Sequence, residues 1–151
     1  MAKQFTPSEI LKLMRETSLM SLAVADSSGQ PQSHMMLFAI DEDFTLYFTT
    51  TKNSGKHKAM QSNNKVGISV LCTDVALVQI TAEVFEIENE AAMTAIEKLA
   101  ESATELPNFW PPLLRLVKEN YVVFKVIPKS IRALDLTDNT ITSAQPLFTN
   151  I

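Results

Sequence analysis

Hydrophobic positions in this chain recur mostly at the two-residue spacing of β-strands. Between residues 80 and 85, for example, Ile80, Ala82 and Val84 alternate with more polar or mixed positions. Apolar runs of this kind predict strands over residues 19–25, 32–40, 45–50, 66–72, 75–87, 121–127 and 130–136. Turn-forming segments at 26–31, 41–43 and 73–74 separate several of them, which indicates an antiparallel meander followed by a hairpin.

A smaller number of segments have helical signals. Thr6, Pro7 and Glu9 form a capping-box pattern with proline at the first helical position, which predicts a helix beginning there. Further helices are expected over residues 54–62 and 88–102, and a short one around residues 113–117. Roughly seven strands with few helices in one domain of residues 1–151 favour a mainly β, α+β fold, a closed or partly closed antiparallel barrel with peripheral helices.

Composition narrows the function classes. The chain has 151 residues and a net charge of −4, which argues against general nucleic-acid binding because that activity needs a basic surface. Cys72 is the sole cysteine, so no intrachain disulfide can form and a reducing cytoplasm is the expected location. No apolar run approaches the length of a bilayer span, so we expect a soluble protein without a membrane partner.

The local charge reverses in the middle of this acidic chain. Residues 44–73 contain no acidic side chain, whereas Lys52, Lys56, Lys58 and Lys65 all lie there. The segment 49–58 is rich in hydroxyls and enters a predicted helix, where free N–H groups, hydroxyls and ammonium groups can converge on a phosphate. The alternative is a solvated lysine-rich connection.

The usual catalytic patterns are missing from the sequence. Its two histidines, His34 and His57, have no metal-binding spacing, so no metal site is expected. No nucleophile elbow, Walker loop or dinucleotide fingerprint is present, and three glycines leave little room for a cradle of bare backbone. Any chemistry is therefore expected to come from a cofactor.

The order of motifs over residues 19–84 resembles the FMN-binding split barrels of the pyridoxamine 5′-phosphate oxidase-like family, particularly the short bacterial general stress proteins. Gly29-Gln30-Pro31 precedes a strand that would contact the flavin, and Ser54-Gly55-Lys56 stands where the family has Ser-Arg-Lys, before a helix and Asn63-Asn64. The resemblance implies a split barrel of about six to seven strands and an FMN site.

Roles carried over by position give a candidate cofactor site. His34, Met35, Met36 and Leu37 would line the isoalloxazine and ribityl chain, partly through backbone groups. Phosphate or ribityl ligands would be Thr49, Thr50, Ser54 and Lys56. The resemblance also implies a homodimer whose flavin sites lie at the interface.

Departures from the family pattern modify this expectation. His34 and Gly55 replace arginines, which removes two guanidinium groups and predicts weaker FMN retention. The carboxy-terminal arginine and tryptophan region for pyridoxamine phosphate has no counterpart, so that substrate is not expected. The resemblance therefore indicates an FMN-dependent oxidoreductase passing electrons between a reduced nicotinamide, or another donor, and an unidentified small molecule. Two alternatives are a non-catalytic flavin- or haem-binding protein, with His34 or His57 as haem ligand, and a ligand-free interaction module.

Overall fold

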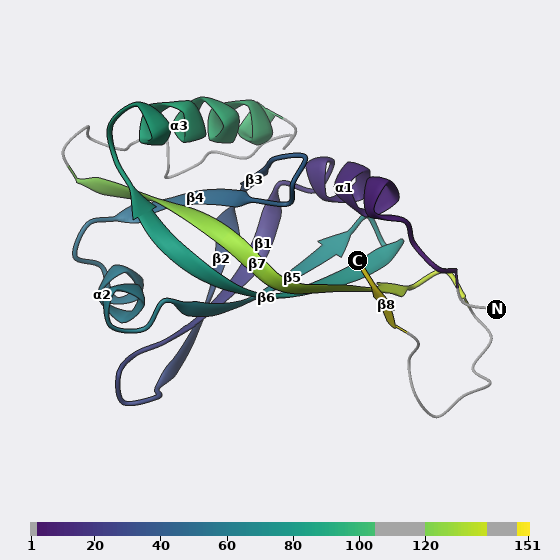
Figure 1. Cartoon of the computed structure of the whole chain (residues 1–151), viewed down its shortest axis with the longest axis horizontal. Coiled ribbons are helices and arrows are strands. Elements are labelled where there is room, and N and C mark those ends of the chain that lie inside the picture. The colour runs from purple at the N-terminus through teal and green to yellow at the C-terminus, as the bar shows by residue number, and fades with distance from the viewer. Residues whose placement is uncertain (1–2, 105–119, 139–147) are drawn as a thin grey trace.

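A computed structural model describes residues 3–104, 120–138 and 148–151 of the chain (Figure 1). The elements follow in the order α1 (Pro7–Arg15), β1 (Leu19–Ala25), β2 (Pro31–Leu37), β3 (Ala39–Ile40), β4 (Leu46–Thr51), α2 (Gly55–Ser62), β5 (Lys65–Cys72), β6 (Ala76–Ile87), α3 (Asn89–Thr104), β7 (Tyr121–Asp135) and β8 (Phe148–Asn150). The helix predicted around residues 113–117 lies outside the described residues.

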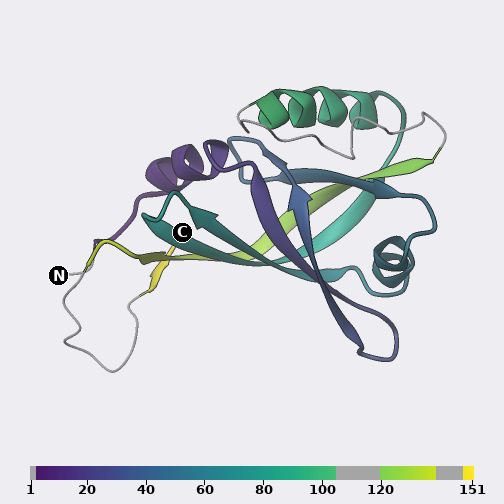
Figure 2. The same ribbon diagram turned by 180° about the vertical axis from the view of Figure 1, so that it is seen from behind.

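The strands form one curled antiparallel sheet. Its order is β2-β1-β5-β6-β7-β4-β3, with β8 paired to β7. Figures 1 and 2 show the sheet curling on itself, with α3 above it, α1 at one end and α2 beside the opposite end. The prediction of a mainly β, partly closed antiparallel barrel with peripheral helices is therefore confirmed.

Phe38 connects the two ends of the curled sheet. The single strand predicted over residues 32–40 is two strands, because the chain stops pairing with β1 at Leu37 and begins pairing with β4 at Ala39. The Phe38 N–H donates to the carbonyl oxygen of Ser18 at 2.9 Å, and its ring is buried. One residue thus connects β2 and β3, which lie at opposite ends of the strand order.

The two strands predicted over residues 121–127 and 130–136 are one continuous strand, β7. Pro128 and Lys129 were expected to separate them, but β7 passes through both residues while pairing with β6. Pro128 pairs with Ala82, where the register shifts between Thr81 and Ala82, and a bulge of this kind accommodates a residue without an N–H donor. The three-residue strand β8 is too short for a recognisable pattern.

The apolar core fills the interior of the curled sheet. Its largest fully buried side chains include Phe48 of β4 and Met14 of α1. The capping box of α1 is present as predicted, with the Glu9 N–H donating to the Thr6 hydroxyl and the Thr6 N–H donating to the Glu9 carboxylate. Within the described residues, no helix combines the length and the apolar character that crossing a bilayer requires.

Candidate functional site

Residues 52–56, which connect β4 to α2 and include the first two residues of that helix, form the loop in which the sequence predicts an anion site. Asn53 adopts a left-handed backbone with φ of 62°, and the Ser54 N–H donates to the carbonyl oxygen of Thr51 at 3.1 Å. Ser54 caps α2 because its hydroxyl accepts the His57 N–H at 3.3 Å. This turn leads the chain from β4 into α2, and we call residues 52–56 the anion loop.

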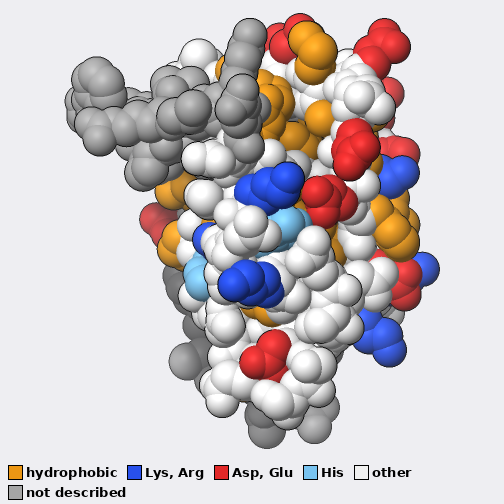
Figure 3. All heavy atoms as spheres, turned by 90° about the vertical axis from the view of Figure 1, so that its left-hand side faces the viewer, with side chains coloured by type: hydrophobic (Ala, Val, Ile, Leu, Met, Phe, Trp, Pro, Cys, Tyr) orange, Lys and Arg blue, Asp and Glu red, His pale blue; other side chains and the backbone are white. Residues whose placement is uncertain are grey.

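Two backbone donors of the anion loop remain free. The N–H groups of Lys52, Asn53 and Ser54 all have acceptors. Among the described residues, the N–H groups of Gly55 and Lys56 have none, as expected for the first positions of a helix. These donors lie at the positive end of the α2 dipole, beside the Lys56 ammonium group. Figure 3 shows basic and histidine side chains gathered on this face of the molecule.

Strand β2 approaches the anion loop through Gln32 and His34. A Cβ atom added to Gly55 would lie 3.6 Å from Gln32 Oε1, which also lies 3.3 Å from His34 Nε2. Burial lowers the pKa of His34, and the nearby Lys56 ammonium lowers it further. Gln32, His34 and Gly55 therefore lie close together where β2 meets the start of α2. The prediction named His34 and Lys56 but missed Gln32.

The two threonines at the end of β4 point in different directions. The Thr50 hydroxyl lies 3.3 Å from the Ser54 hydroxyl, so Thr50 and Ser54 meet beside the anion loop. Thr49 is equally buried, but neighbouring side chains on a strand point to opposite faces. The structure thus brings Thr50, Ser54 and Lys56 toward one place and directs the Thr49 side chain away from it.

The apolar residues predicted to line a flavin divide between the faces of β2. Met36 packs in the main core, on the same face of the strand as His34. Leu37 is buried in a second cluster with Leu99 of α3. Met35 is 68% exposed on the edge strand of the sheet. The three side chains therefore do not form one surface, and a ring lying beside His34 would contact mainly the backbone of β2.

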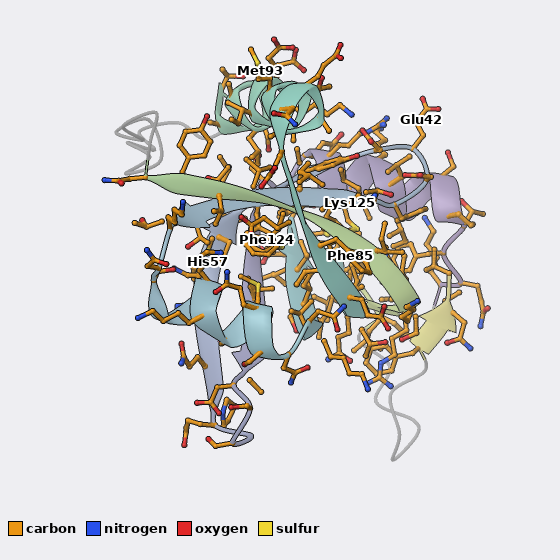
Figure 4. The ribbon with its side chains drawn as sticks, turned by 60° about the vertical axis from the view of Figure 1, so that its left-hand side comes forward. Glu42, His57, Phe85, Met93, Phe124 and Lys125 are labelled. Carbon is orange, nitrogen blue, oxygen red and sulfur yellow. The ribbon has the colours of Figure 1, made fainter. Side chains whose placement is uncertain are left out.

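His57 and Glu86 form a contact at the site that the sequence did not reveal. His57 is 2% exposed, accepts the Asn53 N–H at Nδ1 at 2.9 Å, and lies 3.1 Å from Glu86 Oε2 through Nε2. Its ring packs edge-on against Phe124, toward which it points in Figure 4. Glu86 belongs to β6, so the fold brings a carboxylate close to a stretch of sequence that contains none.

A separate cavity of about 370 Å³ lies between α1, β3 and α3. Its lining includes Arg15, Glu101 and the ion pair of Lys98 and Asp41, whose charged atoms lie 2.6 Å apart. None of the predicted site residues lines this cavity. The ion pair joins α3 to the turn before β4, so we assign it a structural role.

The sequence of residues 6–135 matches the family model described as pyridoxamine 5′-phosphate oxidase. This match covers the anion loop, β2 and all of β7. The chain belongs to the pyridoxamine 5′-phosphate oxidase family. The resemblance seen in the sequence is thereby confirmed.

Solved structures agree with membership of the pyridoxamine 5′-phosphate oxidase family. A candidate pyridoxamine 5′-phosphate oxidase from Listeria innocua is 22% identical, with a TM-score of 0.64 over 85% of this chain and 97% of that one. An F420 reductase is 25% identical, with a TM-score of 0.63 over 80% and 93% of the two chains. A heme binding protein from Mycobacterium smegmatis is 9% identical, with a TM-score of 0.73 over 99% and 60%. No curated protein matches the sequence.

These pyridoxamine 5′-phosphate oxidase-like structures share a fold and differ in the ligands that their names mention. The names include a reductase of F420 and a protein that binds heme. The fold therefore does not select one cofactor, and the choice depends on the side chains and free donors that this chain places around the anion loop.

Proposed function

We propose that this protein binds FMN through the anion loop and β2, and that it acts as an oxidoreductase. One observation supports this proposal above the others. The free N–H groups of Gly55 and Lys56 lie at the start of α2 beside the paired hydroxyls of Thr50 and Ser54, and the Lys56 ammonium group is near enough to lower the pKa of His34. This donor set fits a phosphate monoester, which offers several acceptor oxygens and up to two negative charges.

The remaining roles follow from this anchor. His34 and the backbone groups of β2 would position the isoalloxazine ring, whereas the Met35 side chain points to the opposite face of the strand. When bound, FMN supplies the redox chemistry, taking two electrons from a reduced nicotinamide or another donor and passing them to a small-molecule acceptor. The protein supplies binding, orientation and partial exclusion of water. Pyridoxamine 5′-phosphate itself is not the proposed substrate.

The proposal is tested by the visible spectrum of the purified protein and by titration with FMN and riboflavin. We expect FMN to bind near one molecule per chain and riboflavin to bind much more weakly, because riboflavin lacks the phosphate. Equal affinity for both ligands would show that the anion loop does not hold a phosphate. A protein that binds neither ligand would exclude the flavin function.

Lys56→Ala tests the anchor directly. Its ammonium group is expected to make a charge-assisted hydrogen bond, so its removal should weaken FMN binding by roughly 1.5–3 kcal/mol. The matched control is Lys65→Ala, which removes an exposed lysine of the same acid-free stretch at the start of β5. Isothermal titration of the three proteins measures the difference, and equal dissociation constants would contradict the assignment.

Haem is the second candidate cofactor, and the structure reduces its possible ligands. Both ring nitrogens of His57 already have hydrogen-bond partners, so it is not free to bind iron. His34 is only partly buried, and its Nε2 contacts Gln32. A Soret band that disappears in His34→Ala would favour haem with His34 as the ligand. An unchanged haem spectrum in that variant would exclude histidine ligation by His34.

We also propose that the protein is a homodimer with its flavin sites at the interface. The outer face of β1, β5, β6 and β7 carries a hollow of about 480 Å³ lined by small side chains such as Ser69 and Thr81. An extended face without bulky charged groups at its centre, apart from Arg132, suits a second copy of the same surface.

A further inference from the structure

His57 is a buried histidine whose two ring nitrogens bind different parts of the fold. The Asn53 N–H donates to Nδ1 at 2.9 Å, so Nδ1 carries the lone pair and the ring proton lies on Nε2. Nε2–H then donates to Glu86 Oε2 at 3.1 Å. The tautomer is therefore determined by the partners on both sides.

These contacts connect three elements at the anion loop. The His57 backbone N–H is held by Ser54, and its ring is held by Asn53, Glu86 and an edge-on contact with Phe124. Phe124 in turn stacks on Phe48 with ring centroids 5.4 Å apart, so the imidazole rests on the rigid aromatic core. His57 is therefore fixed by packing, and it fixes the turn that precedes α2.

We propose that His57 is a positioning residue that determines which N–H groups of the anion loop face the ligand. By accepting the Asn53 N–H, the ring holds Asn53 in its left-handed conformation and removes that donor from the ligand side. The free donors are then those of Gly55 and Lys56. The Nε2–H bond to Glu86 Oε2 fixes the other side of the ring and leaves the carboxylate charged near the anion loop.

This inference rests on the proposed function, because it assigns His57 a role in holding the FMN phosphate. Three variants separate the contributions. His57→Phe keeps a ring against Phe124 and removes both hydrogen bonds. His57→Asn places an amide oxygen near the position of Nδ1 and so can still accept the Asn53 N–H. Glu86→Gln keeps an acceptor for Nε2–H and removes the charge.

FMN titration of each variant, alongside its melting temperature, is the main measurement. We expect His57→Phe to raise the FMN dissociation constant by about tenfold or more, as for other residues that orient a ligand-binding group. His57→Asn should restore most of the affinity, to within about threefold of the natural protein. Glu86→Gln should bind at least as tightly as the natural protein, because it removes a nearby negative charge.

Loss of affinity that simply follows loss of melting temperature, with no recovery in His57→Asn, would overturn the proposal. So would unchanged FMN affinity in His57→Phe. If the natural protein binds no FMN, the proposed function fails, and the role of His57 is judged without flavin. In that case ¹⁵N NMR should show the Nε2–H tautomer, and the Asn53 amide should exchange faster in His57→Phe than in His57→Asn. An Nδ1–H tautomer, or equal Asn53 amide exchange rates in the two variants, would overturn the positioning role of His57.

Discussion

Gly55 is the residue at which the anion loop departs most clearly from the family pattern. It occupies the first position of α2, and its missing side chain leaves room for Gln32 of β2. A Cβ atom there would lie 3.6 Å from Gln32 Oε1, an ordinary van der Waals distance. A Cβ atom can therefore be added at this position without displacing Gln32.

Restoring the family arginine is expected to strengthen FMN binding. Gly55→Arg adds a guanidinium group beside two free N–H donors, and a charge-assisted bond to phosphate should tighten binding by about tenfold. Gly55→Ala is the control, because it changes the helix propensity without adding charge. Fluorescence titration with FMN measures both variants. An arginine variant no tighter than the alanine variant would place the phosphate elsewhere.

His34 gives a pH dependence whose sign follows from its environment. Burial lowers the pKa of His34 in the folded protein, and the charge of Lys56 lowers it further. At a pH below the ordinary pKa of histidine, the unfolded chain therefore binds more protons than the folded one. The free energy of unfolding should therefore decrease as the pH falls from 7 through about 6.5 and below. His34→Gln should lose less stability over that range. Urea unfolding at several pH values makes the comparison, and parallel curves would contradict it.

Sequence reasoning located Lys56, Ser54 and Thr50 because they are neighbours along the chain. It missed His57 as a structural link because the contact with Glu86 joins residues 29 positions apart. That contact depends on how far β6 extends beyond Lys65, the first residue of β5, and strand register cannot be read from local composition. The position of Gln32 beside Gly55 depends on the same long-range arrangement.

At the scale of elements, α2 is a capped helix of eight residues whose first turn belongs to the proposed phosphate site. Its cap, Ser54, contacts both His57 and Thr50, so it serves the helix and the anion loop together. The sequence predicted the start and end of this helix closely, because its hydroxyl cap and the Asn63-Asn64 break are local signals.

Substitutions at Ser54 separate its role as the cap of α2 from its role in the anion loop. Aspartate and asparagine are both good helix caps, so Ser54→Asp and Ser54→Asn should unfold within about 1 kcal/mol of the natural protein. Only aspartate places a negative charge beside the phosphate, and its FMN dissociation constant should be higher by at least about tenfold. Thermal unfolding and FMN titration give the two readouts. Equal FMN affinities would argue against an anion at this turn.

The long strand β7 shows where local patterns mislead. Pro128 indicated a break, yet a bulge at the next residue lets β7 continue through 15 residues. Pairing with β6 continues before and after Pro128, whereas pairing with β4 ends at Val126, so the missing N–H of the proline is tolerated. The fold class was nevertheless predictable, because it depends on the number and spacing of apolar runs.

For the whole molecule, the proposed dimer predicts a mass in solution twice that of the chain. Ser69→Lys introduces a long charged side chain into the hollow on the outer sheet face, and on a two-fold axis this change occurs in both copies. We expect the variant to sediment as a monomer and to bind FMN more weakly. Thr94→Lys, on an exposed position of α3, is the control. A dimeric Ser69→Lys protein would place the interface on another face.

The central position of β7 in the sheet also affects how the protein folds during its synthesis on the ribosome. Without β7 the strand order divides into β2-β1-β5-β6 and β4-β3, which only β7 joins as paired neighbours. Translation reaches this strand after every other member of that path has been made. Until then the nascent chain exposes the unpaired edges of β4 and β6, which are templates for pairing with other chains. The period before residue 135 emerges is thus the time at which this protein most needs a chaperone.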